Sequence, residues 1–223
     1  TSASSNTAVG YAALGANTTG ANNTFMGSSA GAANIAQSWS VGIGTSALAA
    51  EATSGSNVAI GGLAMTTSNG AANNVAVGKQ TGYLLTTGDY NVFVGSNCGF
   101  NQTTASNNTA LGYIALYANT TGASNTALGK GALTANTTGA SNTTVGAVSG
   151  AAITTGVENT CIGASTAEGL TTGGNNVCIG LGAGNSGNPG GNLQTTDNRI
   201  VIGNASSANA HIQIDWTVAS DKR

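Results

Sequence analysis

Eleven glycines recur every seventeen residues along this chain, from position 10 to position 180, without an insertion or deletion. Units of one fixed length let each coil lie on the previous coil with the same neighbours, which is how a solenoid is specified. The spacing therefore predicts a rod of stacked coils. These repeat glycines are Gly10, Gly27, Gly44, Gly61, Gly78, Gly95, Gly112, Gly129, Gly146, Gly163 and Gly180.

The residues before each glycine predict a β-strand. In its typical form the block reads Asn, Thr or Val, a small residue, an aliphatic residue and Gly, as in residues 57–61 and 125–129; ten of the eleven units open with Asn, and Ser40 is the exception. Apolar residues at every second position, together with β-branched residues, are typical of a strand. We expect the interior of each coil to contain the aliphatic residue, the Thr or Val, and a column of small residues three places after the glycine.

The second half of each unit often contains Thr-Thr-Gly, as in residues 120–122 and 137–139. We interpret it as a second short strand and a turn, so that the coils form two parallel sheets. Glycine supplies the positive φ of the turn, and stacked Asn side chains can bond their copies above and below. The predicted fold class is an all-β parallel β-solenoid of eleven 17-residue repeats, roughly 50 Å long at about 4.8 Å per coil.

Composition narrows the partners. Charged residues are 5% of the chain, the net charge is −2, and the five basic residues are scattered, which argues against a nucleic-acid partner. No run of eighteen apolar residues exists, so we expect no membrane insertion. Because so thin an interior buries little apolar area, we expect several chains to associate.

The reactive side chains predict neither an enzyme nor a cofactor. Cys161 and Cys178 occupy the same place in adjacent units, within disulfide reach, but parallel side chains have poor bridging geometry, so we expect buried, reduced thiols there and at Cys98. They have no His or carboxylate partner at metal-ligand spacing. The single histidine, His211, lacks a Ser or Cys partner at a triad spacing, and a surface or packed histidine is the favoured interpretation.

The regular spacing ends after Gly180. The next similar block, residues 198–203, arrives after twenty-three residues, and the interval contains the only proline, Pro189. We therefore predict a solenoid shaft over residues 1–187 and a transition or capping segment over residues 188–219. Because the chain begins directly in the repeat, we also expect a further part before Thr1.

The repeat unit resembles two families. Residues 57–61, Asn-Val-Ala-Ile-Gly, are similar to the Asn-Ser-Val-Ala-Ile-Gly head repeats of trimeric autotransporter adhesins, and the seventeen-residue unit is similar to units of phage tail fibres. The resemblance covers roughly residues 6–187. It implies a left-handed β-roll in a homotrimeric rod, with the residues that exceed the shorter adhesin unit placed in the turn.

The end of the chain resembles a processing junction. Residues 198–204, 211–212 and 220–223 are similar to the region before the intramolecular chaperone of endosialidase-type tail spikes and fibres. The resemblance implies that Ser220 and Asp221 are self-cleavage residues, that the bond after Ala219 is cut, and that residues 220–223 begin the removed chaperone domain. A solvated charged tail is the alternative interpretation.

These features favour a structural and host-attachment protein: a trimeric tail-fibre or spike segment of a bacteriophage virion, in contact with other tail proteins and with a host-surface glycan or protein. Trp39, Tyr90, Phe100 and Tyr117 depart from the small-residue norm and are candidate receptor-binding residues, although packing between chains would also explain them. The alternatives are a trimeric surface adhesin on a bacterial cell and an ice-binding solenoid with paired threonines.

Overall fold

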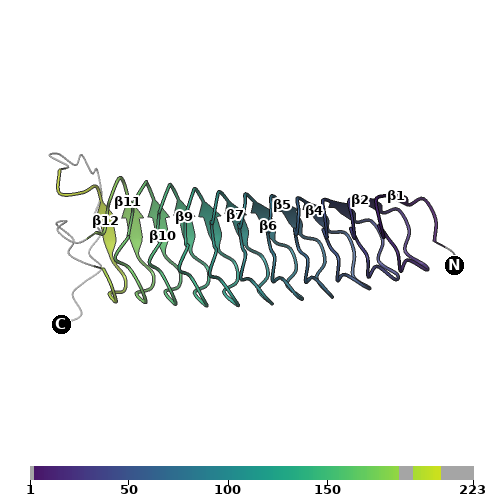
Figure 1. The fold of residues 1–223 in the computed structure, drawn as a ribbon. Helices are drawn as coiled ribbons and strands as arrows, with labels where there is room; N and C mark the ends of the chain where they lie inside the picture. The colour runs from purple at the N-terminus through teal and green to yellow at the C-terminus, as the bar shows by residue number, and fades with distance from the viewer. Residues whose placement is uncertain (1–2, 186–192, 207–223) are drawn as a thin grey trace, which may run out of the picture.

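A computed structural model describes residues 3–185 and 193–206, and these residues form a straight stack of coils (Figure 1). Each coil contributes one three-residue strand to a single twelve-stranded parallel sheet that runs along the rod. No helix occurs among the described residues, which confirms the predicted all-β parallel solenoid. The strands are β1 (Thr7–Val9), β2 (Thr24–Met26), β3 (Val41–Ile43), β4 (Val58–Ile60), β5 (Val75–Val77), β6 (Val92–Val94), β7 (Thr109–Leu111), β8 (Thr126–Leu128), β9 (Thr143–Val145), β10 (Thr160–Ile162), β11 (Val177–Ile179) and β12 (Ile200–Ile202).

The strand register follows the seventeen-residue spacing. Thr126 of β8 lies beside Thr143 of β9, and every pair from β1 to β11 repeats this offset. The last pair spans the longer interval, since Val177 of β11 lies beside Ile200 of β12. The sheet therefore continues beyond the position where the regular spacing ends.

The prediction of a second parallel sheet is wrong. The Thr-Thr-Gly segments form bends rather than strands. At residues 120–121 two consecutive backbone N–H groups donate to one carbonyl, that of Thr137, and the Thr120 hydroxyl donates to the same oxygen at 3.0 Å. A β-ladder requires alternating donors and acceptors, so this side of the coil is hydrogen-bonded between neighbours without forming a sheet.

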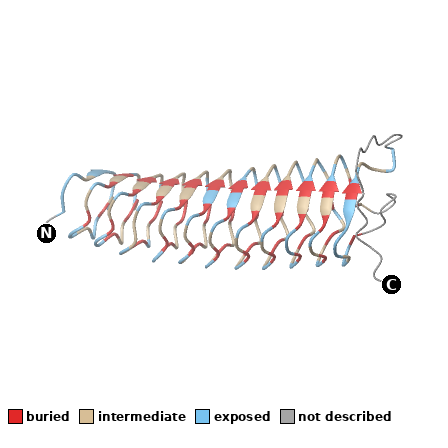
Figure 2. Cartoon of the chain, turned by 180° about the vertical axis from the view of Figure 1, so that it is seen from behind, coloured by how far each residue is buried: buried red, intermediate tan, exposed pale blue. Residues whose placement is uncertain are grey.

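The expected interior is also partly wrong. In β8 the middle residue, Ala127, is fully buried, whereas Thr126 and the aliphatic Leu128 point away from the interior. A three-residue strand turns only its middle side chain inward, because successive side chains alternate between faces. Buried leucines from the rest of the coil, such as Leu116 and Leu133, fill the interior instead. Figure 2 shows this mixture of buried and partly exposed residues along the strands.

The column of small residues three places after each repeat glycine is buried from Ala30 to Ala183, as predicted. The interior is so tight that a large side chain requires a glycine beside it. Phe93 occupies the inward place of β6, and a Cβ added to Gly99 would lie 3.0 Å from its ring. Packing at this density leaves no room for an extra methyl group.

The asparagine column predicted at the start of each unit is a buried ladder. The Oδ1 atom of Asn125 accepts the backbone N–H of Asn142 at 3.0 Å, one coil further on. Its Nδ2 donates at 2.8 Å to the carbonyl of Gly139, which closes its own coil. One side chain therefore joins two coils and fixes the bend of one of them. Ser40 partly replaces this function, since its hydroxyl accepts the N–H of Asn57 at 3.3 Å.

Candidate functional site

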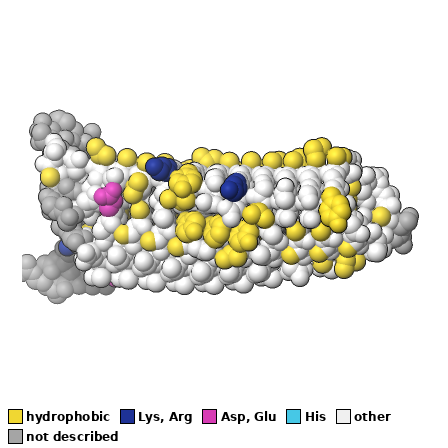
Figure 3. Space-filling model, in the orientation of Figure 1, with side chains coloured by type: hydrophobic (Ala, Val, Ile, Leu, Met, Phe, Trp, Pro, Cys, Tyr) yellow, Lys and Arg dark blue, Asp and Glu magenta, His cyan; other side chains and the backbone are white. Residues whose placement is uncertain are grey.

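The outward face of the sheet is an apolar strip, which we call the outer strip. It consists of the first and third residues of each strand, and these twenty-four positions contain only Thr, Val, Ile, Leu and Met. Leu111 is 51% exposed and Ile162 is 40% exposed. Figure 3 shows a nearly continuous row of hydrophobic side chains along the upper edge of the rod, where Figure 1 places the strands. An uncharged apolar strip of this length is typical of a surface that another protein covers.

Midway along the rod, three aromatic side chains form a stack that we call the aromatic ladder. Tyr83, Phe100 and Tyr117 each lie five residues after a repeat glycine, so three consecutive coils place them side by side. Their ring centroids are 5.0 and 5.3 Å apart, with interplanar angles of 16°. The coil spacing of about 4.8 Å falls within the range of aromatic stacking. The ladder is therefore a direct product of the repeat.

The structure brings together two of the four predicted receptor-binding residues, Phe100 and Tyr117. It adds Tyr83, which the sequence interpretation missed. Aligning the units by their glycines would have found it, because this column contains small residues or Thr in most other units.

Two lysines and a further tyrosine accompany the ladder. Lys79, Tyr113 and Lys130 directly follow repeat glycines, and each lies four residues before the column of the ladder. All three are exposed, and neither lysine forms an ion pair with a described residue. Figure 3 shows hydrophobic side chains gathered midway along the rod, with two Lys or Arg side chains beside them.

The other two predicted residues, Trp39 and Tyr90, lie in a different column, directly before the asparagine ladder. They are 68% and 62% exposed and have left-handed backbone conformations, with φ of 65° and 58°. They are three coils apart, or about 14 Å at the usual strand spacing. They lie outside the column of the aromatic ladder, and neither ring stacks on another aromatic ring among the described residues.

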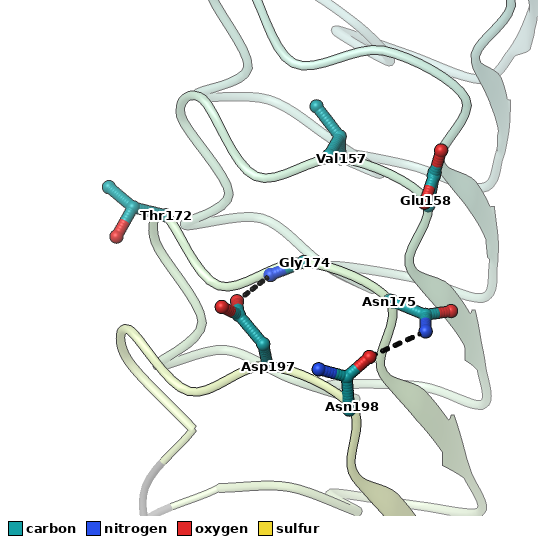
Figure 4. Close-up of a pocket in the computed structure, with 7 residues that line it drawn as sticks. All are labelled: Val157, Glu158, Thr172, Gly174, Asn175, Asp197 and Asn198. Carbon is teal, nitrogen blue, oxygen red and sulfur yellow. Dashed lines mark hydrogen bonds between the residues drawn. The ribbon is translucent and has the colours of Figure 1, made fainter.

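An open hollow of about 380 Å³ lies where the longer last unit meets the preceding coil (Figure 4). Asp197 accepts the backbone N–H of Gly174 at 2.6 Å, and Asn198 accepts a hydrogen bond from Asn175 at 2.7 Å. These bonds hold the longer unit on its neighbour, which is a structural role. The hollow is lined by Val157, Glu158, Thr172, Gly174, Asn175, Asp197 and Asn198.

The paired threonines expose one hydroxyl column rather than two. In the pairs from Thr86 to Thr171, unlike Thr18 in the first coil, the first Thr is half-buried and donates to the next coil, as Thr137 does to the carbonyl of Thr154 at 3.1 Å. The second, such as Thr138, is exposed. The ice-binding alternative thus has a single row of exposed hydroxyls on this side of the rod.

The three thiols are free and buried, as predicted. Burial raises the pKa of Cys98 to about 12. A hydrogen bond with Cys178, together with burial, raises the pKa of Cys161. Protonated thiols, as at Cys98 and Cys161, are poor nucleophiles and metal ligands. No group of three or more His, Cys, Asp or Glu within residues 3–185 and 193–206 is placed to hold a metal ion.

The predicted cleavage residues Ser220 and Asp221, the bond after Ala219, and His211 lie outside the described residues. Within the described part of the chain, no helix is long and apolar enough to cross a membrane. No protein-family model, curated protein or solved structure matches the sequence or the fold.

Proposed function

We propose that this chain is a structural and host-attachment protein without catalytic activity: a shaft segment of a homotrimeric bacteriophage tail fibre or spike. The observation that carries the proposal is the outer strip, which extends over all twelve strands and contains no charged residue. Burial of its large exposed aliphatic side chains would favour association with another chain along the whole length of the rod.

The spacing of the outer strip favours a second copy of this chain as its partner. Side chains such as Val77, Val94 and Leu111 recur once per coil. Only a partner with the same repeat can match every coil along the rod, and another copy has that repeat. Burying one half-exposed aliphatic side chain contributes about 1 kcal/mol. Burial along twelve coils per chain therefore contributes a large favourable free energy of association.

Three copies are favoured because the repeat resembles trimeric fibre and adhesin units. In such an arrangement each sheet faces a common axis, and the bends and aromatic side chains remain outside. A rigid rod that presents side chains on its outer bends is suited to attachment, since binding residues are commonly carried by loops on a rigid scaffold.

The assembly is tested by native mass and by one substitution on the outer strip. We expect the purified protein to have three times the chain mass in light scattering. Leu128→Glu places a charge in the strip and is expected to shift the particle towards monomer. Thr121→Glu, at an exposed bend, is the matched control and should leave the mass unchanged. A monomeric wild-type protein, or equal behaviour of the two variants, would contradict the proposal.

Attachment is tested by incubating the fluorescent protein with a panel of intact bacteria. We expect saturable binding to some cells and not to others, as receptor recognition requires. Absence of binding to every strain, with the trimer intact, would leave a structural shaft without an attachment role. A bacterial surface adhesin is the alternative, with localisation on the cell rather than the virion; a membrane-anchor barrel encoded after Arg223 would favour it over a chaperone.

A further inference from the structure

We propose that the aromatic ladder and its lysines bind a negatively charged polysaccharide that lies along the rod. This inference rests on the proposed attachment function and names its ligand class and its site. We call the site the mid-shaft patch; it consists of Lys79, Tyr83, Phe100, Tyr113, Tyr117 and Lys130.

The mid-shaft patch concentrates residue types that the rest of the rod lacks. Of the seven aromatic side chains that are not buried among the described residues, four lie in it. It also contains two of the three described Lys or Arg side chains, the third being Arg199. In a chain with 5% charged and 4% aromatic residues, this clustering within four neighbouring coils indicates a recognition surface.

The ladder is suited to sugar rings. Pyranose rings present apolar C–H groups beside hydroxyls. Because the three rings stack on one another, their edges and the outer faces of the two end rings are the apolar surfaces that remain for these C–H groups. Tyr83 and Tyr117 carry hydroxyls at the two ends of the stack. Stacking at 5.0 and 5.3 Å restrains the rings before a ligand arrives, which lowers the entropic penalty of binding.

The lysines select for negative charge along an extended ligand. Lys79 and Lys130 lie in one column, three coils apart, which is about 14 Å. Each is exposed and lacks a carboxylate partner among the described residues. A small anion would contact only one of them, whereas a polymer with repeated carboxylate or sulfate groups can contact both while its sugars lie on the ladder.

A second copy of the chain fits this surface less well than a glycan does. An in-register contact between copies would recur in every coil, as the outer strip does. The column of the ladder contains Ala32, Ala49 and Ala151 in other coils, so the aromatic surface is local. An aromatic surface that is confined to a few coils fits a ligand that is short compared with the rod.

The test is affinity electrophoresis of the native protein in gels that contain dextran, dextran sulfate or polygalacturonate. We expect retardation by at least one of the two charged polymers and none by neutral dextran. Retardation by dextran sulfate alone assigns sulfate groups, and by polygalacturonate alone assigns carboxylates. Equal retardation by all three polymers, or by none, would overturn the proposal.

Substitutions locate the site. The triple variant Tyr83→Ala, Phe100→Ala, Tyr117→Ala introduces a residue that the same column already accepts, and it should weaken binding about tenfold or more. Lys79→Ser with Lys130→Ser should weaken binding and reduce its dependence on salt; Ser28 and Ser96 occupy that column naturally. Tyr11→Ala, in the column of Tyr113 but far from the patch, is the control and should bind normally.

The thermal unfolding curve of each variant verifies that the rod is intact. Undiminished binding by a folded triple variant would exclude the ladder as the site. The proposed function fails separately, through a monomeric particle or absence of cell binding. A trimer that binds cells equally well with and without the ladder would refute only the mid-shaft patch.

Discussion

Gly112 lies so close to Gly129 that a Cβ added to Gly112 would be 2.5 Å from the carbonyl oxygen of Gly129, and the φ of Gly112 is +140°. Both the contact and the backbone conformation exclude side chains. Gly112→Ala should therefore lower the free energy of unfolding by more than about 3 kcal/mol. Urea unfolding at a fixed protein concentration measures this change, since association of chains would make stability depend on concentration.

Gly62 provides the matched control for this substitution. It follows a repeat glycine, a Cβ added to it would meet no atom within 4 Å, and its φ lies outside the left-handed range. The same column contains Ala147 and Ala164 in other coils. Gly62→Ala should leave stability unchanged or slightly raised. Equal losses in the two variants would contradict the close approach of the repeat glycines.

The asparagine ladder predicts a second large effect. Asn125→Ala removes the acceptor of the Asn142 N–H and the donor to the Gly139 carbonyl, and all three residues are buried. Unpaired buried groups cost about 2–4 kcal/mol in total. Asn125→Ser should cost less, because Ser40 shows that a hydroxyl can accept the next N–H. If Asn125→Ala is as stable as Asn125→Ser, the asparagine ladder contributes little to the stability of the fold.

Substitution of Trp39 or Tyr90 is predicted to raise the stability of the fold. Both have left-handed backbone conformations, and Asn or Ser occupies nearly all other described places in their column. Asn adopts this conformation more readily than a bulky residue. Trp39→Asn and Tyr90→Asn should each raise the free energy of unfolding by about 0.5–1 kcal/mol, as judged from urea midpoints. Tyr11→Asn, exposed and without a positive φ, should give no gain.

A gain at Trp39 or Tyr90 would mean that the aromatic residue is retained at the expense of stability, as expected of a binding residue. A loss would show instead that the ring packs against the rod or against another chain. Cell-binding measurements on the same two variants then separate a receptor contact from a neutral surface residue.

The fold could be predicted from the sequence because a fixed unit length alone specifies stacking in register. The buried small-residue column and the asparagine ladder follow from it, since each place in a unit meets its own copies. The direction of the strand side chains could not be predicted. Apolar residues such as Leu128 fit either an interior or a surface that a partner covers, and period two does not distinguish these faces.

The candidate site was only half predicted. Phe100 and Tyr117 were predicted as single bulky residues. The site is formed by both of them together with Tyr83, because all three occupy the same column of the repeat. Lys79 and Lys130 are fifty-one residues apart and look scattered in the linear sequence. Because fifty-one is three times the unit length, the fold places them in one row. The repeat converts sequence distance into position along the rod, and only an alignment of units makes that visible.

The carboxyl group of Glu51 is buried in the third coil. Its oxygens accept hydrogen bonds from the Ser68 hydroxyl and from the Gly70 backbone N–H at 3.1 Å. Burial nevertheless raises the pKa of Glu51, because removal from water disfavours the charged form more than these hydrogen bonds favour it. The charged carboxylate therefore weakens the folded state at neutral pH.

The pH dependence of stability tests this carboxyl group. An acid with a raised pKa in the folded state contributes stability below its unfolded pKa, about 4.3, and loses that contribution as the pH rises through the folded value. Lowering the pH from about 7 to about 5 should therefore stabilise the wild-type protein more than Glu51→Gln, which has no charge to lose. Glu158→Gln, at an exposed position, controls for the removal of one negative charge. Thermal unfolding of the three proteins at both pH values provides the comparison. Parallel responses of the wild type and Glu51→Gln would show that the Glu51 carboxylate is well solvated, and that the third coil is more open to water than its burial implies.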